Sequence, residues 1–354
     1  HRLYRNFVTR SMSENLIFGK SVKQFGAVGD GKADDTEAFE KALESKENLL
    51  CVPYGTYKIS KPLALHGNLK ISCHKRARID FVGASASVPS DNITVCGGIW
   101  NSVNTQDCAF DFTDASHVTL EHVTVNSVSD CVVGFCSGRH LVVVDSFLTS
   151  GRTASGIVFG DKCGNIYLSN NKYSGCVAAI EFVPGAEIDN LVAVTLDSDD
   201  CEMLVAANES QLTDCRFSHL SGHVSANALK ISSCRLTEVC FSGVSVHDGY
   251  IRLDGNNYNN FNLRKLNRLS ELEADTLKPS LEISGSDCTV ICDGLSLDSM
   301  ILAKKSIPDI KMTAARMAMP VPSVYSYTAE IPLNKNNSFT LPVGDIELLE
   351  VSDN

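Results

Sequence analysis

The sequence predicts an all-β chain whose central part winds into a single-stranded parallel β-helix, a solenoid of stacked coils. The first observation is a short phrase, a polar residue followed by a run of β-formers, that returns every 21 to 25 residues. Its apolar anchors are Leu69, Ile93, Val118, Leu141, Ile166, Leu191, Leu212 and Leu236. A repeat of this period is typical of a solenoid, because one coil cannot bury its apolar face and needs its neighbours.

The second observation is another apolar row in step with the first, at intervals of 22 to 25 residues. It consists of Phe110, Val132, Ile157, Ile180, Leu204, Leu229 and Ile251. Two strand rows per turn describe a β-helix in which each coil advances by about 4.8 Å. The third observation is the polar residue before each anchor, usually Asn. Because Asn tolerates a left-handed backbone and can bond its stacked neighbour, it predicts a tight bend.

Composition narrows the function classes. The chain has 354 residues, 44% of them hydrophobic, which is enough for a large core. Its net charge of −11 argues against a nucleic-acid partner, whose affinity rests on Lys and Arg at phosphates. No apolar run has the length of a membrane span, so we expect no membrane insertion. No phosphate loop or metal-ligand spacing is present, so we expect no cofactor and no metal.

The fourteen cysteines follow the coil period rather than the spacing of a disulfide scaffold. Cys108 and Cys131, for example, are 23 residues apart, and Cys176 and Cys201 are 25 apart. A small, buried, apolar residue suits an inward-facing stack. We therefore expect reduced core cysteines rather than disulfides, and folding in a reducing compartment.

The ends of the chain depart from the repeat. Asp34 or Asp35 can cap a helix that begins near Thr36. The leucines at 263, 266, 269 and 272 predict an amphipathic helix after a polar loop at 256–260. No signal peptide is visible, although the chain begins at His1 without a Met, as it would if an upstream segment had been removed. The predicted parts are an N-terminal arm (1–20), an N-terminal cap (21–60), the β-helix (61–300) and a C-terminal β cap or association module (301–354).

Residues 22–39 and 51–59 resemble the N-terminal signature of the pectate-lyase-like superfamily. That group includes bacterial polysaccharide lyases and hydrolases, phage tailspikes and neck appendages. The resemblance implies a right-handed parallel β-helix with a capping helix and a small C-terminal β region. Asp30, Asp34 and Asp35 fit turn and capping duty, with a calcium loop as the alternative.

Residues 92–100 look more narrowly like the strand and Gly-Gly turn of the polygalacturonase branch. Residues 104–107 resemble its Asn-Thr-Asp motif with one residue inserted, and residues 129–131 its Asp-Asp-Cys motif with Ser first. Where that branch has His-Gly, this chain reads Ser155-Gly156. Members invert at the anomeric carbon with three aspartates, and the resemblance gives two counterparts here, Asp107 and Asp130.

The spacing of Asp107 and Asp130 carries its own prediction. They are 23 residues apart, one coil, so their carboxylates should lie about 5 Å apart on one face. Two carboxylates at that distance raise each other's proton affinity, as an acid and base pair requires. The separation is nearer that of retaining glycosidases than of inverting ones. The alternative is that Asp simply begins a strand after a turn, since Asp-Cys recurs at residues 200–201, 214–215 and 287–288.

Three further residues are candidates for substrate binding. Trp100, beside Asn104, either stacks on a sugar ring or is buried between coils. Arg152 lies in a predicted turn, where it meets an anionic sugar, abstracts a proton as in lyases, or is simply solvated. The acidic cluster at residues 197–202 either binds a cation or forms a solvated turn.

Two functions from different classes remain in view. We favour a glycan-binding protein of phage tailspike or appendage type, located on a virion tail or outside the cell, that also has the means to depolymerise a bacterial surface polysaccharide. The alternative is a bacterial polysaccharide-degrading enzyme, a glycoside hydrolase or polysaccharide lyase. A purely structural virion module is third. Because tailspikes act as trimers, a homotrimer is one expected assembly.

Overall fold

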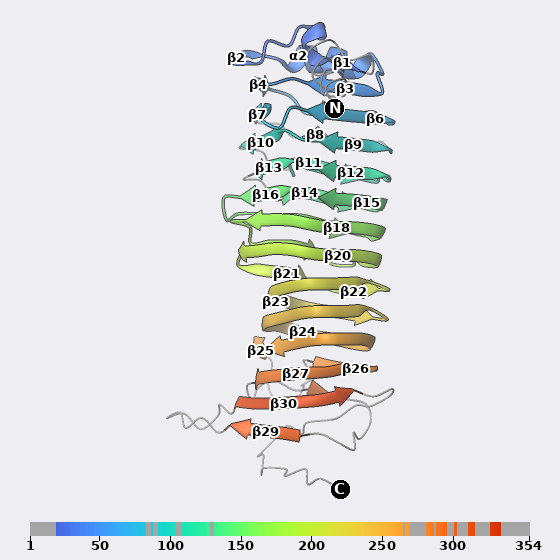
Figure 1. The fold of residues 1–354 in the computed structure, drawn as a ribbon, viewed down its shortest axis with the longest axis vertical. Helices are drawn as coiled ribbons and strands as arrows, with labels where there is room; N and C mark the ends of the chain where they lie inside the picture. Colours follow the sequence, from blue (N-terminus) through green and yellow to red (C-terminus); the bar gives the residue numbers. More distant parts are fainter. Residues whose placement is uncertain are drawn as a thin grey trace, which may run out of the picture. The chain divides into compact units, whose positions relative to one another are not determined.

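The computed structural model describes residues 19–82, 86–87, 91–103, 108–127, 131–264, 266–269, 281–286, 288–295, 301–302, 311–315 and 326–333. The chain divides into two compact units, unit 1 (His1–Ala154) and unit 2 (Ser155–Asn354). Both are built of parallel β coils, so the predicted β-helix is confirmed (Figure 1). No described helix has the length and hydropathy needed to span a membrane.

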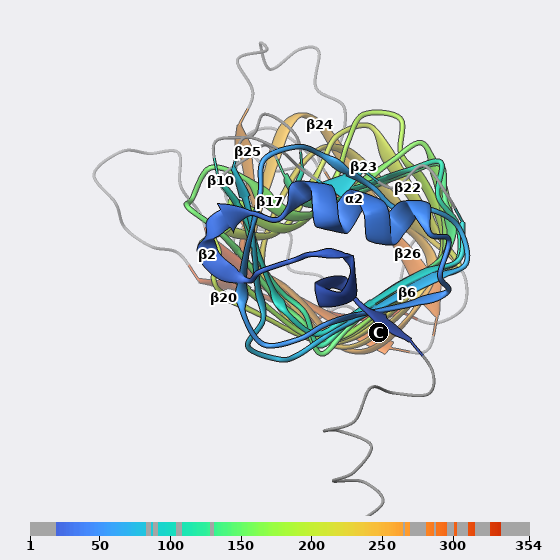
Figure 2. The same cartoon turned by 90° about the horizontal axis from the view of Figure 1, so that it is seen from above.

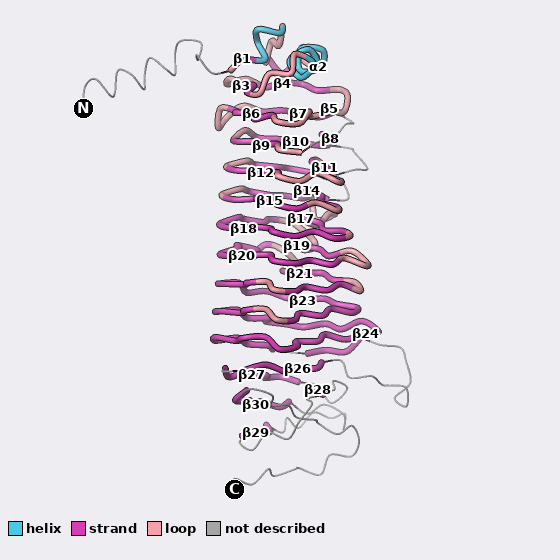
Figure 3. Tube along the Cα trace, turned by 90° about the vertical axis from the view of Figure 1, so that its right-hand side faces the viewer, coloured by secondary structure: helices cyan, strands magenta, loops and turns pink. Residues whose placement is uncertain are grey.

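Unit 1 begins with a cap. It comprises β1 (Lys20–Ser21), the 3-10 helix η1 (Val22–Phe25), β2 (Asp30–Asp34) and α2 (Thr36–Glu44). The apolar side chains Ala38, Phe39, Ala42 and Leu43 of α2 are buried, as their spacing predicts. Figure 2 shows α2 lying across the end of the first coils, and Figure 3 shows that the described helices belong to this cap. A helix there covers strand edges that would otherwise be free to pair.

The strands of unit 1 form three rows, each paired in parallel from coil to coil. The first row is β3 (Leu49–Val52), β6 (Leu69–Cys73), β9 (Ile93–Cys96), β12 (Val118–Glu121) and β15 (Arg139–Val144). The second row is β4 (Thr56–Ile59), β7 (Arg78–Val82), β10 (Ile99–Val103), β13 (Thr124–Ser127) and β16 (Phe147–Ser150). The third row is β5 (Leu63–Ala64), β8 (Ala86–Ser87), β11 (Phe110–Thr113) and β14 (Cys131–Cys136).

The predicted first-row anchors stack as expected in this unit. Leu69 pairs with Ile93, Ile93 with Val118, and Val118 with Leu141. All four are at most 2% exposed. Vertical stacking of like residues therefore forms the core, as the repeat predicts.

The bend before each anchor has the predicted left-handed backbone. Asn68 and Asn92 have φ of 57° and 62°, and the Asn92 amide donates to the Asn68 side-chain oxygen at 2.9 Å. On the next two coils His117 and His140 occupy the same position, with φ of 56° and 59°. Their rings stack with centroids 4.5 Å apart, so the contact between coils is kept by a different pair of side chains.

Unit 2 has the same coils with longer strands. They are β17 (Ser155–Gly160), β18 (Lys162–Ser174), β19 (Ala178–Phe182), β20 (Glu187–Asp200), β21 (Met203–Ala207), β22 (Ser210–Thr213), β23 (Arg216–Ser232), β24 (Arg235–Arg264), β25 (Leu266–Leu269), β26 (Leu281–Ser286), β27 (Cys288–Leu295), β28 (Ile301–Leu302), β29 (Lys311–Ala315) and β30 (Ser326–Leu333). β30 pairs antiparallel with β27 and β29. The predicted boundaries at 20, 60 and 300 stay predictions.

The register of the later repeats is where the sequence prediction is wrong. Leu212 pairs with Ile188 rather than with Leu191, and Leu236 pairs with Phe217. The physical reason is the bend: Leu191 follows its bend, whereas Leu212 precedes the left-handed Asp214. The other predicted apolar row, which begins at Phe110, has the same kind of slip.

Within the row that begins at Phe110, Ile157 pairs with Ile180 as predicted. Phe110, however, pairs with Val133, one residue past the predicted Val132. Ile180 likewise pairs with Val205 instead of Leu204. Adjacent apolar residues in each run make such one-residue slips invisible in the sequence.

The predicted helix after residue 260 is wrong where the structure describes it. Residues 256–260 and 263 belong to β24, and residues 266–269 form β25, which continues the parallel pairing from Val244 onward. A three-residue leucine spacing fits one helical face, but the pairing offered by the preceding coil outweighs it. Residue 272 lies outside the described residues.

Candidate functional site

A column of polar side chains runs along the outward side of the second row of unit 1. Lys58, Asp80, Asn101, Asn126 and Thr149 occupy the same register position on β4, β7, β10, β13 and β16, and we call them the polar ladder. The Asn101 amide donates to Asp80 at 2.6 Å and the Asn126 amide to Asn101 at 2.6 Å. The Thr149 hydroxyl donates to Asn126 at 2.5 Å. The side chains are therefore fixed relative to one another.

Strand alternation places the ladder outward. The residues just before its members, Tyr57, Ile79, Trp100, Val125 and Leu148, point inward and are at most 1% exposed. The ladder members themselves are half-buried. Amides, a carboxylate and a hydroxyl in one line offer both donors and acceptors, which is what the hydroxyl groups of a sugar require.

The predicted catalytic residues and Asn104 follow β10 and β13 in the sequence. Asn104, Asp107 and Asp130 lie outside the described residues, so their roles stay predictions. Their chain neighbours are described: Cys108 and Cys131 have Cα atoms 4.5 Å apart. The positions that follow the two aspartates are thus neighbours on adjacent coils.

Cys108 and Cys131 also form a disulfide. The expectation of reduced cysteines is wrong for this pair, because stacking on adjacent coils brings the two side chains within bonding reach. Ten other cysteines in the described part of the chain form no disulfide, among them the buried Cys163, Cys176, Cys215 and Cys234. These four fit the expected inward-facing role.

Trp100 is buried, which corrects its assignment as a substrate-binding residue. It is 1% exposed, and its Nε1–H donates to the Gly97 carbonyl oxygen at 3.1 Å. Its ring lies between Phe81 and Phe110, at centroid distances of 6.1 and 5.1 Å. It occupies an inward position of β10, so no sugar can reach its face.

Arg152 lies in the turn after β16. It is exposed and has a left-handed backbone with φ of 64°. Its predicted contact with an anionic sugar stays a prediction.

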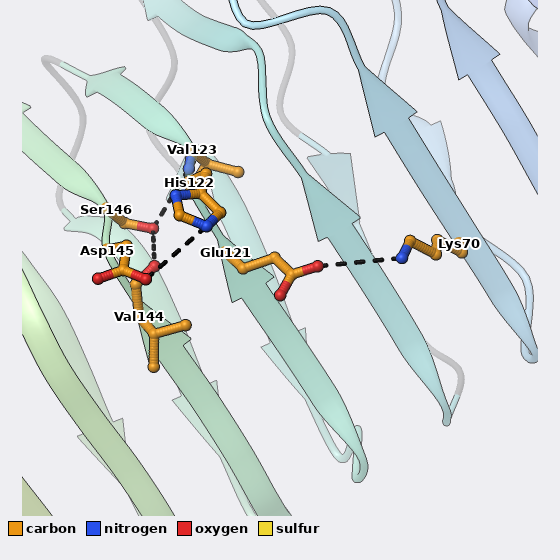
Figure 4. Close-up of polar contacts among 7 residues, drawn as sticks. All are labelled: Lys70, Glu121, His122, Val123, Val144, Asp145 and Ser146. Carbon is orange, nitrogen blue, oxygen red and sulfur yellow. Dashed lines mark hydrogen bonds and ion pairs between the residues drawn. The ribbon is translucent and has the colours of Figure 1, made fainter. Parts of the chain in front are cut away.

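A second polar cluster lies at the corner between the first and second rows (Figure 4). His122 Nε2 is 3.7 Å from Asp145 Oδ2, and Lys70 Nζ is 4.0 Å from Glu121 Oε1. The Val123 N–H donates to the Ser146 hydroxyl at 3.3 Å. The charged pairs are partly exposed, and such pairs contribute about 1 kcal/mol or less, so this cluster ties coils together only weakly.

The carboxylates of Asp34 and Asp35 accept hydrogen bonds within the turns of the cap, as predicted. Both carboxylate oxygens of buried Asp35 accept backbone N–H groups, from Val28 at 2.6 Å and Gly29 at 3.0 Å. Asp34 accepts the Thr36 N–H at the start of α2. Hydrogen bonds from the hydroxyls of Ser60 and Thr36 lower the pKa of Asp34 to about 2. Carboxylates engaged in this way do not form the alternative calcium loop.

The acidic cluster of unit 2 lies at the end of β20 and contacts the neighbouring strand β18. Lys172 Nζ lies 3.7 Å from Asp197 Oδ2, and the Ser174 hydroxyl donates to Asp200 at 2.7 Å. Across the described residues, no three His, Cys, Asp or Glu side chains gather as a metal site requires. The predicted turn is wrong for residues 197–200, which form the exposed end of β20, and only residues 201–202 form a bend.

The sequence reasoning missed the polar ladder. A signal was present, because Asp80, Asn101, Asn126 and Thr149 are separated by 21, 25 and 23 residues, within the range of coil lengths. The polar residues of the sequence repeat mark the bends before the first-row anchors. The polar ladder instead recurs at one position inside the second-row strands.

Comparisons with known proteins agree with this fold. Residues 20–95 match the family model described as rhamnogalacturonase A/epimerase, pectate lyase-like. The chain is 38% identical over 97 residues to the preneck appendage protein of Bacillus phage PZA, which is 26% of this chain and 11% of that protein. It is 45% identical over 65 residues to the pre-neck appendage protein of Bacillus phage phi29, 18% of this chain and 8% of that protein. The matches thus span about a tenth of the relatives' length.

Among solved structures, the exopolygalacturonase of Thermotoga maritima is similar in fold. The TM-score is 0.52 at 11% sequence identity, covering 79% of this chain and 91% of that one. At that identity the likeness concerns the fold alone.

Proposed function

From the chain's membership of the pectate-lyase-like right-handed parallel β-helix superfamily, we propose that it is a glycan-binding protein of the phage appendage type. Its ligand is a polysaccharide of a bacterial surface, and its place is a virion tail. The segments shared with the two phage appendage proteins support this assignment. The observation that carries the binding function is the polar ladder of unit 1.

The polar ladder suits a glycan for two reasons. Its side chains are held by one another, so little rotamer freedom remains to be lost when a ligand binds. Its members recur at the strand spacing of about 4.8 Å, close to the length of one sugar residue. A chain of sugar residues laid across the coils meets a polar group at each step.

Cleavage is the second part of the proposal. Asp107 and Asp130 follow directly from the second-row strands, and the 4.5 Å separation of the neighbouring Cys108 and Cys131 Cα atoms supports a carboxylate pair one coil apart. In such a pair one protonated carboxyl donates to the glycosidic oxygen. The other, ionised, attacks the anomeric carbon as its bond to that oxygen breaks, since about 5 Å is the separation of retaining enzymes. Water, deprotonated by the first carboxylate, then hydrolyses the glycosyl ester and restores both carboxyl groups. Asn104 and Arg152 are proposed to position the substrate.

A screen of bacterial surface polysaccharides with the full chain tests this function, with mass measured by sedimentation and products analysed. We expect a trimer that binds at least one polysaccharide. Asn126→Ala breaks the ladder at two bonds and should weaken binding at least tenfold. Asn165→Ala, at a bend of unit 2 where Asn165 accepts from Asn190, is the matched control and should have no effect.

Two results would contradict the proposal. One is that no polysaccharide binds, and the other is that Asn126→Ala and Asn165→Ala behave alike. A monomer that releases reducing or unsaturated ends would support the alternative, a bacterial polysaccharide-degrading enzyme.

A further inference from the structure

The most basic stretch of the described chain lies beside an exposed aromatic ring. His74, Lys75, Arg76 and Arg78 place four basic side chains within five residues, in a chain with a net charge of −11. Tyr54 is 63% exposed, whereas most other Phe, Tyr and Trp rings in the described part of unit 1, such as Tyr57, are buried. Exposed aromatic rings of this kind are uncommon in the molecule, so their surroundings are informative.

The ring is held in place by these basic residues. Thr56 pairs with Arg78, which sets Tyr54 and Arg76, each two residues earlier, at matching positions on adjacent coils. The Arg76 guanidinium carbon lies 5.7 Å from the Tyr54 ring centroid, and the His74 ring meets the Tyr54 ring edge-on at 5.7 Å and 78°. We call Tyr54, His74, Lys75 and Arg76 the tyrosine platform.

The imidazole is itself fixed. The Arg76 backbone N–H donates to His74 Nδ1 at 3.2 Å, so this nitrogen acts as an acceptor. The ring edge of His74 therefore stays against Tyr54, and the aromatic face keeps a defined orientation.

The cations of the platform have no acidic partner in the part of the chain that the structure describes. Arg78 lies 3.7 Å from Asp80, but among the described residues neither Lys75 nor Arg76 forms an ion pair.

We propose that the tyrosine platform binds a sugar residue that carries an anionic group, a carboxylate or a phosphate. The sugar ring stacks on the open face of Tyr54, and the anion meets Lys75 and Arg76. This inference rests on the proposed function, which it deepens by naming an acidic glycan. The platform precedes β4 and β7, whereas the predicted carboxylates follow β10 and β13.

Calorimetric titration of the full chain tests the platform with three hexasaccharides: oligogalacturonate, a phosphorylated maltohexaose and neutral maltohexaose. We expect at least one anionic probe to bind more tightly than the neutral one, with an affinity that falls as salt rises. Tyr54→Ala and Arg76→Gln should each weaken that binding at least tenfold. Arg76→Lys should retain part of it, because it keeps the charge.

The matched control is Tyr167→Ala, which removes an exposed tyrosine of unit 2 that is 44% exposed. Equal binding of neutral and anionic probes, or equal effects of Tyr54→Ala and Tyr167→Ala, would overturn the proposal. The test is independent of the polar ladder: if Tyr54→Ala weakens binding while Asn126→Ala does not, the platform stands and the ladder assignment fails. If Asn126→Ala weakens binding while Tyr54→Ala does not, the platform assignment fails and the ladder assignment stands.

Discussion

The two units build the same coil with different interiors. In unit 1 aromatic rings follow one another through the core, with Phe81 against Trp100, Trp100 against Phe110, and Phe112 against Phe135 at 5.2 Å. In unit 2 an apolar cavity lies among side chains that include Phe182, Leu212, Val224, Leu229 and Phe241. A solenoid repeat thus specifies which residues point inward without specifying how well they fill the interior.

This difference bears on function. The polar ladder lies directly over the closely packed residues of β7, β10 and β13, such as Trp100 and Val125. A rigid layer beneath a binding surface keeps its polar groups in position. Unit 1 therefore has the properties expected of the part that recognises a ligand.

The sharpest test of the packing comparison is the same substitution in each unit. Val125 is 0% exposed and pairs with Trp100 and Leu148, so Val125→Ile should lower the free energy of unfolding by roughly 1–3 kcal/mol through overpacking. Val224 lines the cavity, so Val224→Ile has room for the added carbon and should change stability by less than about 1 kcal/mol. Denaturant titration measures both. Equal losses would show that the two interiors are packed alike.

A smaller effect is expected in the cap of unit 1. The folded-state pKa of Asp34, about 2, lies below its ordinary value of 3.8, so the carboxylate stabilises the fold above pH 4. That contribution is lost as the pH falls from about 4 to about 2. Asp34→Asn should lower stability at pH 7 by about 1 kcal/mol or less, because the group is exposed, and the difference from the wild type should disappear as the pH falls through the folded-state pKa.

Thermal unfolding at a series of pH values gives this comparison. Ser60→Ala, which removes the strongest hydrogen bond to Asp34, should reproduce part of the effect. A difference between Asp34→Asn and the wild type that persists unchanged below pH 2 would contradict the assignment.

The sequence predicts the coil best where a bend residue marks the start of a strand. Leu69, Ile93 and Val118 follow Asn or His at a left-handed bend, and all three stack as predicted. Leu212 and Leu236 stand in similar phrases, but the bends at Asp214 and Ser233 set a different register. Coil length varies, and only the backbone pairing reveals where each bend falls.

Site residues are harder to predict than the fold. Trp100 lies near a turn in the sequence, yet strand alternation turns it inward, where aromatic neighbours bury it. Asn101, the next residue, points outward and joins the polar ladder. A shift of one residue separates a core position from a surface position, so composition near a motif does not identify a binding residue.

Product analysis with Asp107→Asn and Asp130→Asn tests the central claim most directly, which is that unit 1 both holds a glycan and cuts it. Each variant should bind the polysaccharide identified in the screen as tightly as the wild type and release new chain ends at least a hundredfold more slowly, since the proposal assigns the two carboxylates to one acid and nucleophile pair. Cleavage by both variants at the rate of the wild type would contradict the account.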